Sequence, residues 1–367
     1  VDFNNGKASI GTGPFEFKEF IKGDRLVLEK NANYWGQKAE WDTVTMKPIT
    51  NAAARMAALL AGDVDMIAAP PTQDLDKLKG NDDFVLAQGL SNRVIYLHMD
   101  QFGPATPGIK GTGKPDAKYE GEGYCADNEC EKNPLLDKRV RQALSKAIDR
   151  EAIVAKIMGG VAVAAGELLP QGFFGTNPGA KPEAYDPEGA KKLLAEAGYP
   201  DGFEATVYIT ERPALLTPMQ IIQAQLKKIG VEVKLEVTEH SAWHKAIRDN
   251  VSAMVLYGAA RFPVADTYLT QFYHSDSTVK TPTAVTNFSH CDVADDQITA
   301  ARSEADPAKQ IALWAEAQTA IVEEVCSVPL FELLQVWGRS PDLDYGYDLK
   351  GALSLGPVIN ETTTKSE

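Results

Sequence analysis

The sequence predicts an α/β fold with mixed sheets, because strand-like segments alternate with helix-like segments along its second half. Phe203–Thr210 and Val231–Val237 have the residue pattern of strands, and Met219–Lys228 between them has the spacing of a helix closed by Gly230. Asp186-Pro187-Glu188 begins another helix, and Asp306-Pro307, an aspartate cap followed by a first-turn proline, begins a final long helix. We find no internal repeat in the sequence.

The first part of the chain is predicted to form shorter elements. Strands are expected at 15–20 and 25–29, and a helix is expected at 51–61 with Asn51 as its cap. A strand at 64–67, a helix at 73–79 and a strand at Arg93–His98 follow. Glycine and proline are frequent in Gln101–Asn133, so this stretch is predicted to be a long surface excursion.

Beyond residue 133 the predicted helices and strands are longer. The remaining predicted helices are Asp137–Met158, Asp186–Glu196, Ser241–Arg248 and 307–325. The remaining predicted strands are Ala253–Tyr257 and Val328–Phe331. His98, inside a predicted strand, is expected to be a core histidine whose nitrogens are hydrogen-bonded.

Composition excludes several classes of protein. The chain has 367 residues, 44% hydrophobic and 24% charged, which is the balance of a globular protein large enough for more than one domain. Lys plus Arg total 37 against 51 Asp plus Glu, a net charge of −14 without any basic block, so no nucleic-acid partner is expected. No apolar run reaches the roughly 18 residues that a membrane-spanning helix needs. Val1 is not a methionine and no leader pattern follows it, so we expect that it is not the start of the gene product.

Four cysteines leave two interpretations open. Cys125 and Cys130 lie in a polar segment with four residues between them, a spacing that a local disulfide can close. Cys291 and Cys326 would form a second disulfide in an oxidising compartment. The alternative is free, buried thiols. A zinc site would require more histidines near the cysteines.

The motifs of enzymes are incomplete. Gly108–Lys114 has the spacing of a phosphate-binding loop, but Pro115 stands where Ser or Thr would bind magnesium. His240 and His244 are four residues apart on a predicted helix, yet Ser241 replaces the glutamate of a zinc peptidase. No Gly-x-Ser-x-Gly elbow occurs, so neither a catalytic residue, a metal site nor a cofactor is predicted.

Six sequence blocks follow one another in a recognisable order. They are Gly11–Phe15, Leu26–Gly36, Arg55–Asp65, Leu136–Arg150, Tyr185–Tyr199 and Leu226–Val231. Together they resemble the extracellular solute-binding proteins of family 5, the peptide- and nickel-type receptors of ABC importers. The resemblance covers essentially the whole chain.

The resemblance implies a periplasmic-binding-protein-like fold (type II, cluster C) with two α/β lobes that close on a ligand. Residues 1–91 with 334–367 would form an incomplete first lobe, and residues 92–333 the second lobe. Roughly the first third of a family member is expected to have no counterpart in this sequence. The implied protein is a periplasmic monomer, free or lipid-anchored, that binds a small solute or peptide and delivers it to a permease.

One departure from the family bears on the ligand. Peptide receptors of this family carry a Gly-Trp-x-x-Asp segment whose aspartate pairs with the peptide ammonium, and the matching stretch here is Tyr257–Pro263. Depending on the alignment register, Arg261 or Phe262 stands in place of the acid. A guanidinium favours a carboxylate or phosphate, so we predict an anionic or N-blocked ligand, such as an opine-like conjugate or an acidic peptide. An ordinary peptide, with Asp266 taking its ammonium, is the alternative.

The ligand-binding residues predicted on this basis are Arg261, Phe262, Tyr257, Trp243, Arg212 and Arg93. Two other functions remain open. A metal-chelate receptor would bring His240, His244 and His290 together, and a hydrolase on the same scaffold would need an activated nucleophile or a metal.

Overall fold

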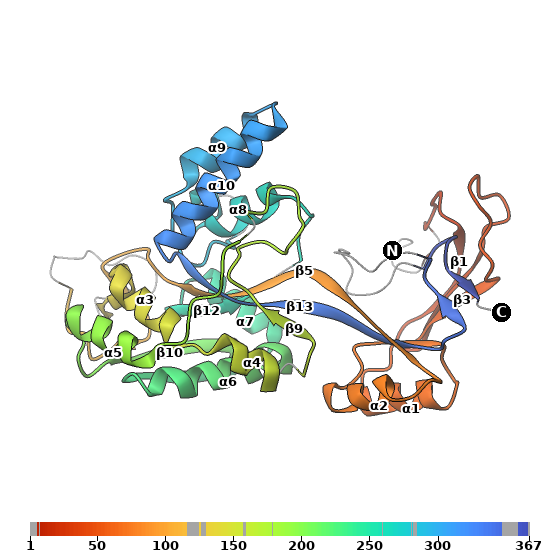
Figure 1. Cartoon of the computed structure of the whole chain (residues 1–367), viewed down its shortest axis with the longest axis horizontal. Coiled ribbons are helices and arrows are strands. Elements are labelled where there is room, and N and C mark those ends of the chain that lie inside the picture. The colour runs from red at the N-terminus through yellow and green to blue at the C-terminus, as the bar shows by residue number, and fades with distance from the viewer. Residues whose placement is uncertain are drawn as a thin grey trace. The chain divides into compact units, whose positions relative to one another are not determined.

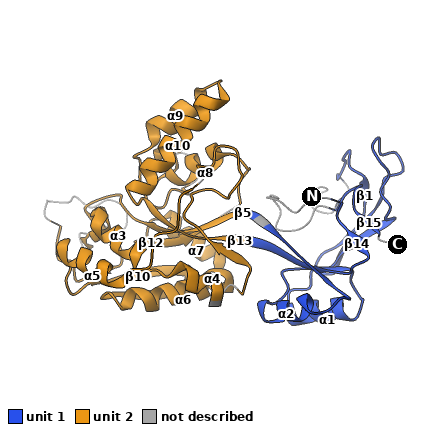
Figure 2. Cartoon of the chain, viewed as in Figure 1, with its two compact units in different colours: residues 1–91, 334–367 blue, residues 92–333 orange. Residues whose placement is uncertain are grey.

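The structure is a computed structural model that describes residues 6, 8–115, 125, 130–156, 159–177, 179–258, 260–279, 281, 285–346 and 359–365. The chain divides into two compact units, residues 1–91 with 334–367 (unit 1) and residues 92–333 (unit 2) (Figure 2). The assignment of these two units to the two expected lobes stays a prediction. No helix in the described part of the chain is long and apolar enough to cross a membrane.

Unit 1 contains a three-stranded antiparallel sheet in the order β1-β2-β3. Its strands and helices are β1 (Phe15–Ile21), β2 (Arg25–Lys30), β3 (Thr43–Met46), α1 (Ala52–Leu60), β4 (Met66–Ala68), η1 (Thr72–Asp74), α2 (Leu75–Lys79), β14 (Leu343–Asp344) and β15 (Thr364–Lys365). Asn51 caps α1 as predicted, because its side chain accepts a hydrogen bond from the Ala54 amide at 2.9 Å. The core of this unit is small: Met56, Leu59, Ile67 and Leu78 form its buried cluster.

Unit 2 is built on two sheets. In the first, β10 (Phe203–Thr210) pairs in parallel with β11 (Val231–Thr238) and in antiparallel with the short β7 (Ile109–Lys110). The predicted strand–helix–strand order is confirmed here, and the intervening helix, α6 (Pro213–Lys227), packs on both parallel strands. The segment 101–133 was predicted to be a surface excursion, but Ile109 within it is buried in the unit's core.

The second sheet has the strand order β12-β5-β13-β4, with β9 (Ala162–Ala164) paired to β13. Its two long strands, β5 (Val85–Met99) and β13 (Ser327–Arg339), run through the boundary between the units, whereas β12 (Met254–Tyr257) pairs with β5 inside unit 2. Along β5, Ile95, Leu97 and Met99 belong to one buried cluster while Val94 and Tyr96 belong to another. This alternation is the period of two expected when both faces of a sheet are covered.

The other elements of unit 2 lie around these sheets or pack on one another, and α9 and α10 extend away from the sheets (Figure 1). They are β6 (Ala105–Thr106), β8 (Glu131–Lys132), η3 (Pro134–Leu136), α3 (Lys138–Lys146), α4 (Arg150–Lys156), α5 (Pro187–Glu196), α7 (His240–Arg248), α8 (Ala265–Tyr273), η4 (Ser275–Ser277), α9 (Asp295–Ser303) and α10 (Pro307–Glu323). α3 packs on α5, α7 packs on β10, and α10 packs on α8 and α9.

The single helix predicted at Asp137–Met158 is wrong, because α3 and α4 are separate helices. Asp149 accepts a hydrogen bond from the Ala152 amide at 2.9 Å and so caps a new helix. The buried Arg150 guanidinium donates to the carbonyl oxygens of Ser145 at 3.1 Å and Ile148 at 3.3 Å. These bonds satisfy carbonyl groups that the break leaves without helical partners.

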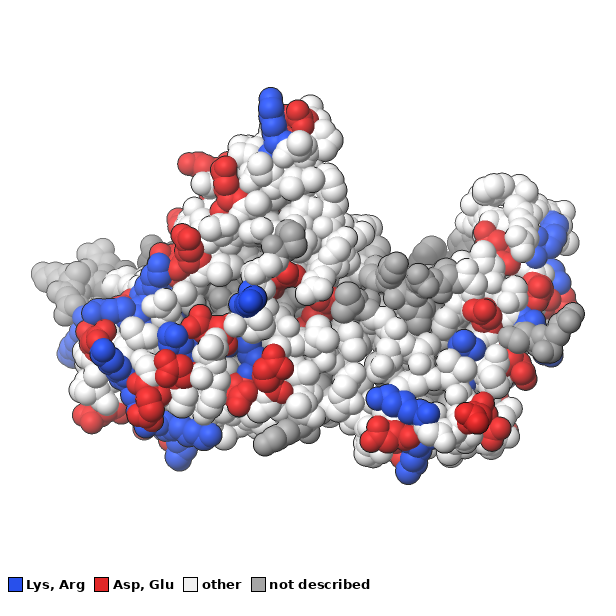
Figure 3. Space-filling model, in the orientation of Figure 1, with Lys and Arg blue, Asp and Glu red and all other residues white. Residues whose placement is uncertain are grey.

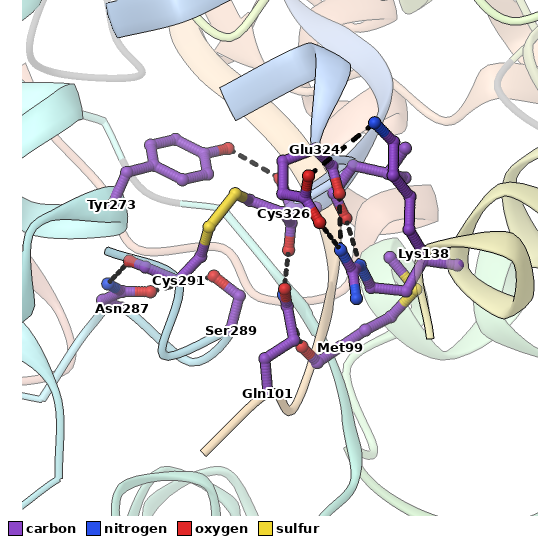
Figure 4. The surroundings of a disulfide bond; sticks show 12 residues. Met99, Gln101, Lys138, Tyr273, Asn287, Ser289, Cys291, Glu324 and Cys326 are labelled. Carbon is purple, nitrogen blue, oxygen red and sulfur yellow. Dashed lines mark hydrogen bonds and ion pairs between the residues drawn. A yellow bond between two sulfur atoms is a disulfide. The ribbon is translucent and has the colours of Figure 1, made fainter. Parts of the chain in front are cut away.

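Two disulfides cross-link unit 2. Cys125 and Cys130 are joined with their Cα atoms 5.4 Å apart, and Cys291 and Cys326 are joined with their Cα atoms 5.7 Å apart. The second disulfide ties the end of the α10–β13 connection to a loop stabilised by Asn287, whose side chain donates to the Cys291 carbonyl oxygen at 2.9 Å (Figure 4).

Candidate ligand site in unit 2

Two arginines of unit 2, Arg212 and Arg261, act electrostatically on a third, Arg93. Arg93 is on β5, Arg212 is the residue before α6, and Arg261 is in the loop between β12 and α8. Burial lowers the pKa of Arg93, and the like charges of Arg261 and Arg212 lower it further, while the Tyr257 and Tyr268 phenols act in the opposite direction. We call Arg93, Arg212 and Arg261 the arginine cluster.

Arg261 is held by neutral groups. Its Nε donates to the side-chain oxygen of Gln271, and Nη1 donates to the Ala260 carbonyl oxygen at 3.0 Å. The guanidinium carbon lies 5.0 Å from the centre of the Phe272 ring, a cation–π arrangement. Among the described residues no carboxylate pairs with Arg261 and no group accepts a hydrogen bond from Nη2. These contacts therefore fix the orientation of the Arg261 guanidinium, and its positive charge has no carboxylate partner among the described residues.

The predicted aromatic residues differ in exposure. Tyr257 is 8% exposed, whereas Trp243 is 1% exposed and its indole nitrogen donates to the Tyr208 carbonyl oxygen at 3.1 Å. The Trp243 and Tyr257 rings lie 6.0 Å apart within the core. Phe262 is 61% exposed. Burial of Trp243 favours a packing role. Stacking of Trp243 on a ligand stays a prediction, and so does ligand contact by Tyr257 and Phe262.

His244 lies beside the arginine cluster. Burial lowers its pKa, and the charges of His240, Arg248 and Arg212 lower it further. The His240 and His244 rings are 4.5 Å apart, and His240 Nδ1 lies 3.3 Å from the Thr210 hydroxyl. The described residues contain no group of three or more histidine, cysteine or acidic side chains able to hold a metal ion.

The acid that the sequence offers for a peptide ammonium is already paired. Asp266 Oδ1 accepts from Arg302 Nε at 3.1 Å and from the Thr270 hydroxyl at 2.9 Å. His290 Nδ1 lies 2.9 Å from Asp100 Oδ1. His290 therefore contacts Asp100 and does not join His240 and His244. The contacts of Asp266 and His290 therefore form neither the peptide-ammonium site nor the three-histidine metal-chelate site that the sequence leaves open.

Sequence reasoning missed the residues that position Arg261. The Tyr268 hydroxyl donates to the Asn92 carbonyl oxygen and accepts from the Arg261 amide at 3.4 Å, and the Asn92 side chain donates to the Arg261 carbonyl oxygen at 3.1 Å. The four-residue spacing of Tyr268 and Phe272 marks one face of α8, and that spacing was the available signal.

The face drawn in Figure 3 carries acidic and basic side chains interspersed, without an extended patch of one sign. The arginine cluster is defined by side chains from β5, the start of α6 and the β12–α8 loop.

Comparison with known proteins places these features in context. The model of the family "Bacterial extracellular solute-binding proteins, family 5 Middle" matches residues 2–280. The dipeptide-binding protein of Escherichia coli is 28% identical over 68% of this chain and 42% of its own length. The glutathione-binding protein GsiB of Salmonella typhimurium is 28% identical over 88% of this chain and 58% of its own length. The chain therefore spans roughly half the length of these relatives.

Solved structures match more of the chain. The solute-binding protein MoaA of A. tumefaciens, in complex with mannopinic acid, has a TM-score of 0.77 and 38% identity, over 100% of this chain and 68% of that chain. DppA of Helicobacter pylori, in complex with the peptide STSA, has a TM-score of 0.74 and 26% identity, over 97% of this chain and 63% of that chain. The predicted periplasmic-binding-protein fold is confirmed by these matches.

Proposed function

Because this chain belongs to the bacterial extracellular solute-binding proteins of family 5, we propose that it is the ligand-binding part of a receptor for a small anionic or N-blocked solute. The family consists of solute-binding proteins and not of enzymes. The proposed receptor works in the periplasm as a monomer, free or lipid-anchored, and passes its solute to the permease of an ABC importer. It needs no cofactor for this task.

The observation that carries the proposal is the charge of the arginine cluster. Arg261 and Arg212 each repel Arg93 as like charges, and an anion bound beside Arg93 would relieve this repulsion. Arg261 has its Nη2 donor available, and guanidinium groups bind carboxylates with two parallel hydrogen bonds. A peptide ammonium would be repelled by the same charges.

The relatives support an anionic ligand without deciding it. The solved relative with the higher identity, 38%, holds mannopinic acid, an acid, whereas the 26% identical relative holds a peptide. Glutathione, named for the GsiB relatives, is also acidic. An opine-like conjugate or an acidic peptide therefore suits the arginine cluster better than a neutral dipeptide.

Ordinary peptides are the second candidate, because the dipeptide-binding relative matches 68% of the chain. In that case Asp266 would have to leave Arg302 to reach the peptide ammonium. A metal-chelate receptor has less support, since the described residues gather no set of three metal-binding side chains.

A thermal-shift panel tests the proposal. We would compare mannopinic acid, glutathione, N-acetylglutamate and the dipeptide Ala-Ala, each against the chain and its Arg261→Asp variant. A ligand at 100 times its dissociation constant stabilises a protein by about 2.7 kcal/mol, which is a visible rise in Tm. We expect the anionic compounds to raise Tm and the Arg261→Asp variant to lose that response.

Arg25→Gln is a matched control, because it removes one positive charge from an exposed ion pair in unit 1. This variant should respond to anions as the parent chain does. A rise in Tm with Ala-Ala that survives Arg261→Asp would instead identify a conventional peptide receptor.

A further inference from the structure

A pocket of about 370 Å³ lies in unit 2 between α3, the start of α4, the end of α10 and the start of β13. Its polar lining includes Lys138, Gln142, Ser145, Arg150, Lys181 and Glu323. None of the residues that line it belongs to the arginine cluster. A ligand in this pocket would therefore occupy a site distinct from the proposed solute site.

Arg150 gives the pocket a buried positive charge. The residue is 3% exposed, and burial lowers the pKa of its guanidinium to about 10, so the group stays charged at neutral pH. Nε donates to the Pro329 carbonyl oxygen at 2.8 Å, Nη1 donates to carbonyl oxygens, and Nη2 donates to the Ser145 hydroxyl oxygen at 2.9 Å. The Glu183 carboxylate acts on Arg150 through its charge but is bonded to Lys146 at 2.8 Å. Among the described residues, Arg150 thus has no bonded carboxylate, and one Nη2 hydrogen has no acceptor.

Other donors of the lining also lack acceptors. Lys181 is exposed and makes no hydrogen bond or ion pair with a described residue, and the Gln142 side chain makes none either. The Ser145 hydroxyl accepts from Arg150, while no described residue accepts its own hydrogen. Lys138, which shares a face of α3 with Gln142 and Ser145, has only a loose ion pair, 3.7 Å long, with Glu324.

Two acids line the pocket and oppose this positive charge. Glu183 is neutralised by its ion pair with Lys146. Glu323 is exposed at the end of α10 and has no bonded cation in the described part of the chain. Three cations therefore face one uncompensated carboxylate, and the lining offers more donors than acceptors.

One wall of the pocket is held in place without a ligand. Val325, at the α10–β13 connection, has a φ of 54°, a conformation that a β-branched residue rarely adopts. Arg141 holds this turn by donating to the carbonyl oxygens of Val325 at 3.0 Å and Glu324 at 2.6 Å. The next residue, Cys326, is bonded to Cys291 (Figure 4). The wall is therefore preformed, as ligand pockets usually are.

We propose that this pocket binds a small oxyanion with two negative charges, such as phosphate or a short dicarboxylate, held by Arg150 and Lys181 with Gln142 as a further donor. Charged donors make the strong hydrogen bonds to such anions. The volume is near the lower limit for small-molecule pockets, which suits a compact anion better than a peptide. The inference does not rest on the solute-receptor function, because the two sites share no residue.

Isothermal titration with inorganic phosphate and with succinate at pH 7.5 tests the proposal, with sodium chloride of equal ionic strength and neutral succinamide as references. We expect at least one of the two anions to bind, and we expect the Lys181→Ala and Gln142→Glu variants to weaken that binding about tenfold or more. Glu323→Gln should tighten it, because this variant removes the opposing charge. The Tm of each variant without anion shows whether it is folded.

Lys309→Ala is the matched control. Lys309 is also an exposed lysine without a partner among the described residues, but it lies on α10 about 20 Å along the helix from Glu323. This variant should bind the anion as the parent chain does. Equal weakening in Lys181→Ala and Lys309→Ala would mean that only net charge matters and would overturn the proposal.

Lysine acetylation with an N-hydroxysuccinimide ester gives a readout on the parent chain. Bound anion should slow acetylation of Lys181 and leave that of Lys309 unchanged. The site is also overturned if neither anion binds at millimolar concentration, or if binding survives Lys181→Ala and is lost in Arg261→Asp. That last result would place the anion at the arginine cluster. A failure of the proposed function is seen separately, as an absence of N-acetylglutamate binding.

Discussion

The arginine cluster and the buried Glu332 on β13 lie in the same compact unit, and burial affects their charges in opposite ways. The arginines keep theirs: burial lowers the pKa of Arg93, but an arginine starts so far above neutrality that it stays charged. Glu332 is driven toward its neutral form, because burial raises its pKa to about 7. A carboxyl group can escape the cost of burial by taking up a proton, whereas a guanidinium must find partners.

A change of pH around neutrality therefore leaves Arg93 charged and changes the charge of Glu332. Four variants test how burial and charge act in this unit.

The Glu332→Gln variant should change the pH dependence of stability most. The pKa of Glu332 is raised from 4.5 when unfolded to about 7 when folded, so its contribution to stability is present below pH 4.5 and is lost as pH rises through 7. A shift of that size corresponds to about 3 kcal/mol. Relative to the parent chain, the variant should gain about this much between pH 4.5 and 8.5, measured by urea denaturation. A stability difference that is the same at both pH values would contradict the assignment.

The His98→Leu variant should act at the acid end. His98 was expected to be hydrogen-bonded, which is wrong: it is fully buried among aromatic rings, and neither ring nitrogen has a hydrogen-bond partner among the described residues. Burial, and then His290, lower its pKa from 6.5 to about 3, so stability is lost as pH falls below 6.5. At pH 5 the loss is about 2 kcal/mol, and the variant should not suffer it. The prediction would be refuted if thermal melts showed the same change in Tm between pH 7 and pH 5 for the variant and the parent chain.

The Arg261→Lys variant tests whether the arginine cluster binds through geometry or through charge alone. Lysine keeps the charge but loses the planar donors and the contact with Phe272, so the affinity for an anionic solute should fall by about 1–2 kcal/mol. Titration of N-acetylglutamate would measure this. An unchanged dissociation constant would mean that only net charge matters.

His244→Gln serves as a companion variant. If protonation of His244 tightens anion binding below pH 6.5, the variant should lose this pH dependence.

The smallest effect on stability is expected at Phe262, which is 61% exposed. The Phe262→Ser variant should shift the free energy of unfolding by no more than about 0.5 kcal/mol. If Phe262 contacts the ligand, the affinity for the solute will fall while stability does not. A variant that loses stability and affinity together would show that the side chain supports the β12–α8 loop.

Much of the fold could be predicted from local sequence. The Asn51 cap, the Asp306 cap and the αL glycine at 198 are set by interactions within a few residues, and the structure contains all three. The break between α3 and α4 could not be predicted, because the apolar spacing continues through it. The Arg150 guanidinium also hydrogen-bonds to the Pro329 carbonyl oxygen, far along the chain, and such a partner has no local signature.

The candidate site shows the same limit. The sequence singled out Arg93, Arg212, Arg261 and Tyr257, but the positioning of Arg261 by Tyr268 and Asn92 depends on two residues that are 176 positions apart. Glu332 was not singled out, since it stands among the many acids of a chain with 51 of them. Only its position on β13 shows that it is buried and short of hydrogen-bond partners.

By itself, the sequence determined most of the longer helices and strands, the family, and the absence of an acid at the position where peptide receptors carry one. These follow from periodicity, caps and residue order, which are properties of neighbours along the chain. The tertiary structure alone decided which charges meet and which are buried. The pKa and the partners of an ionisable group are set only when distant segments pack around it. Solvation and Coulomb energy depend on distance in space and not on separation in sequence.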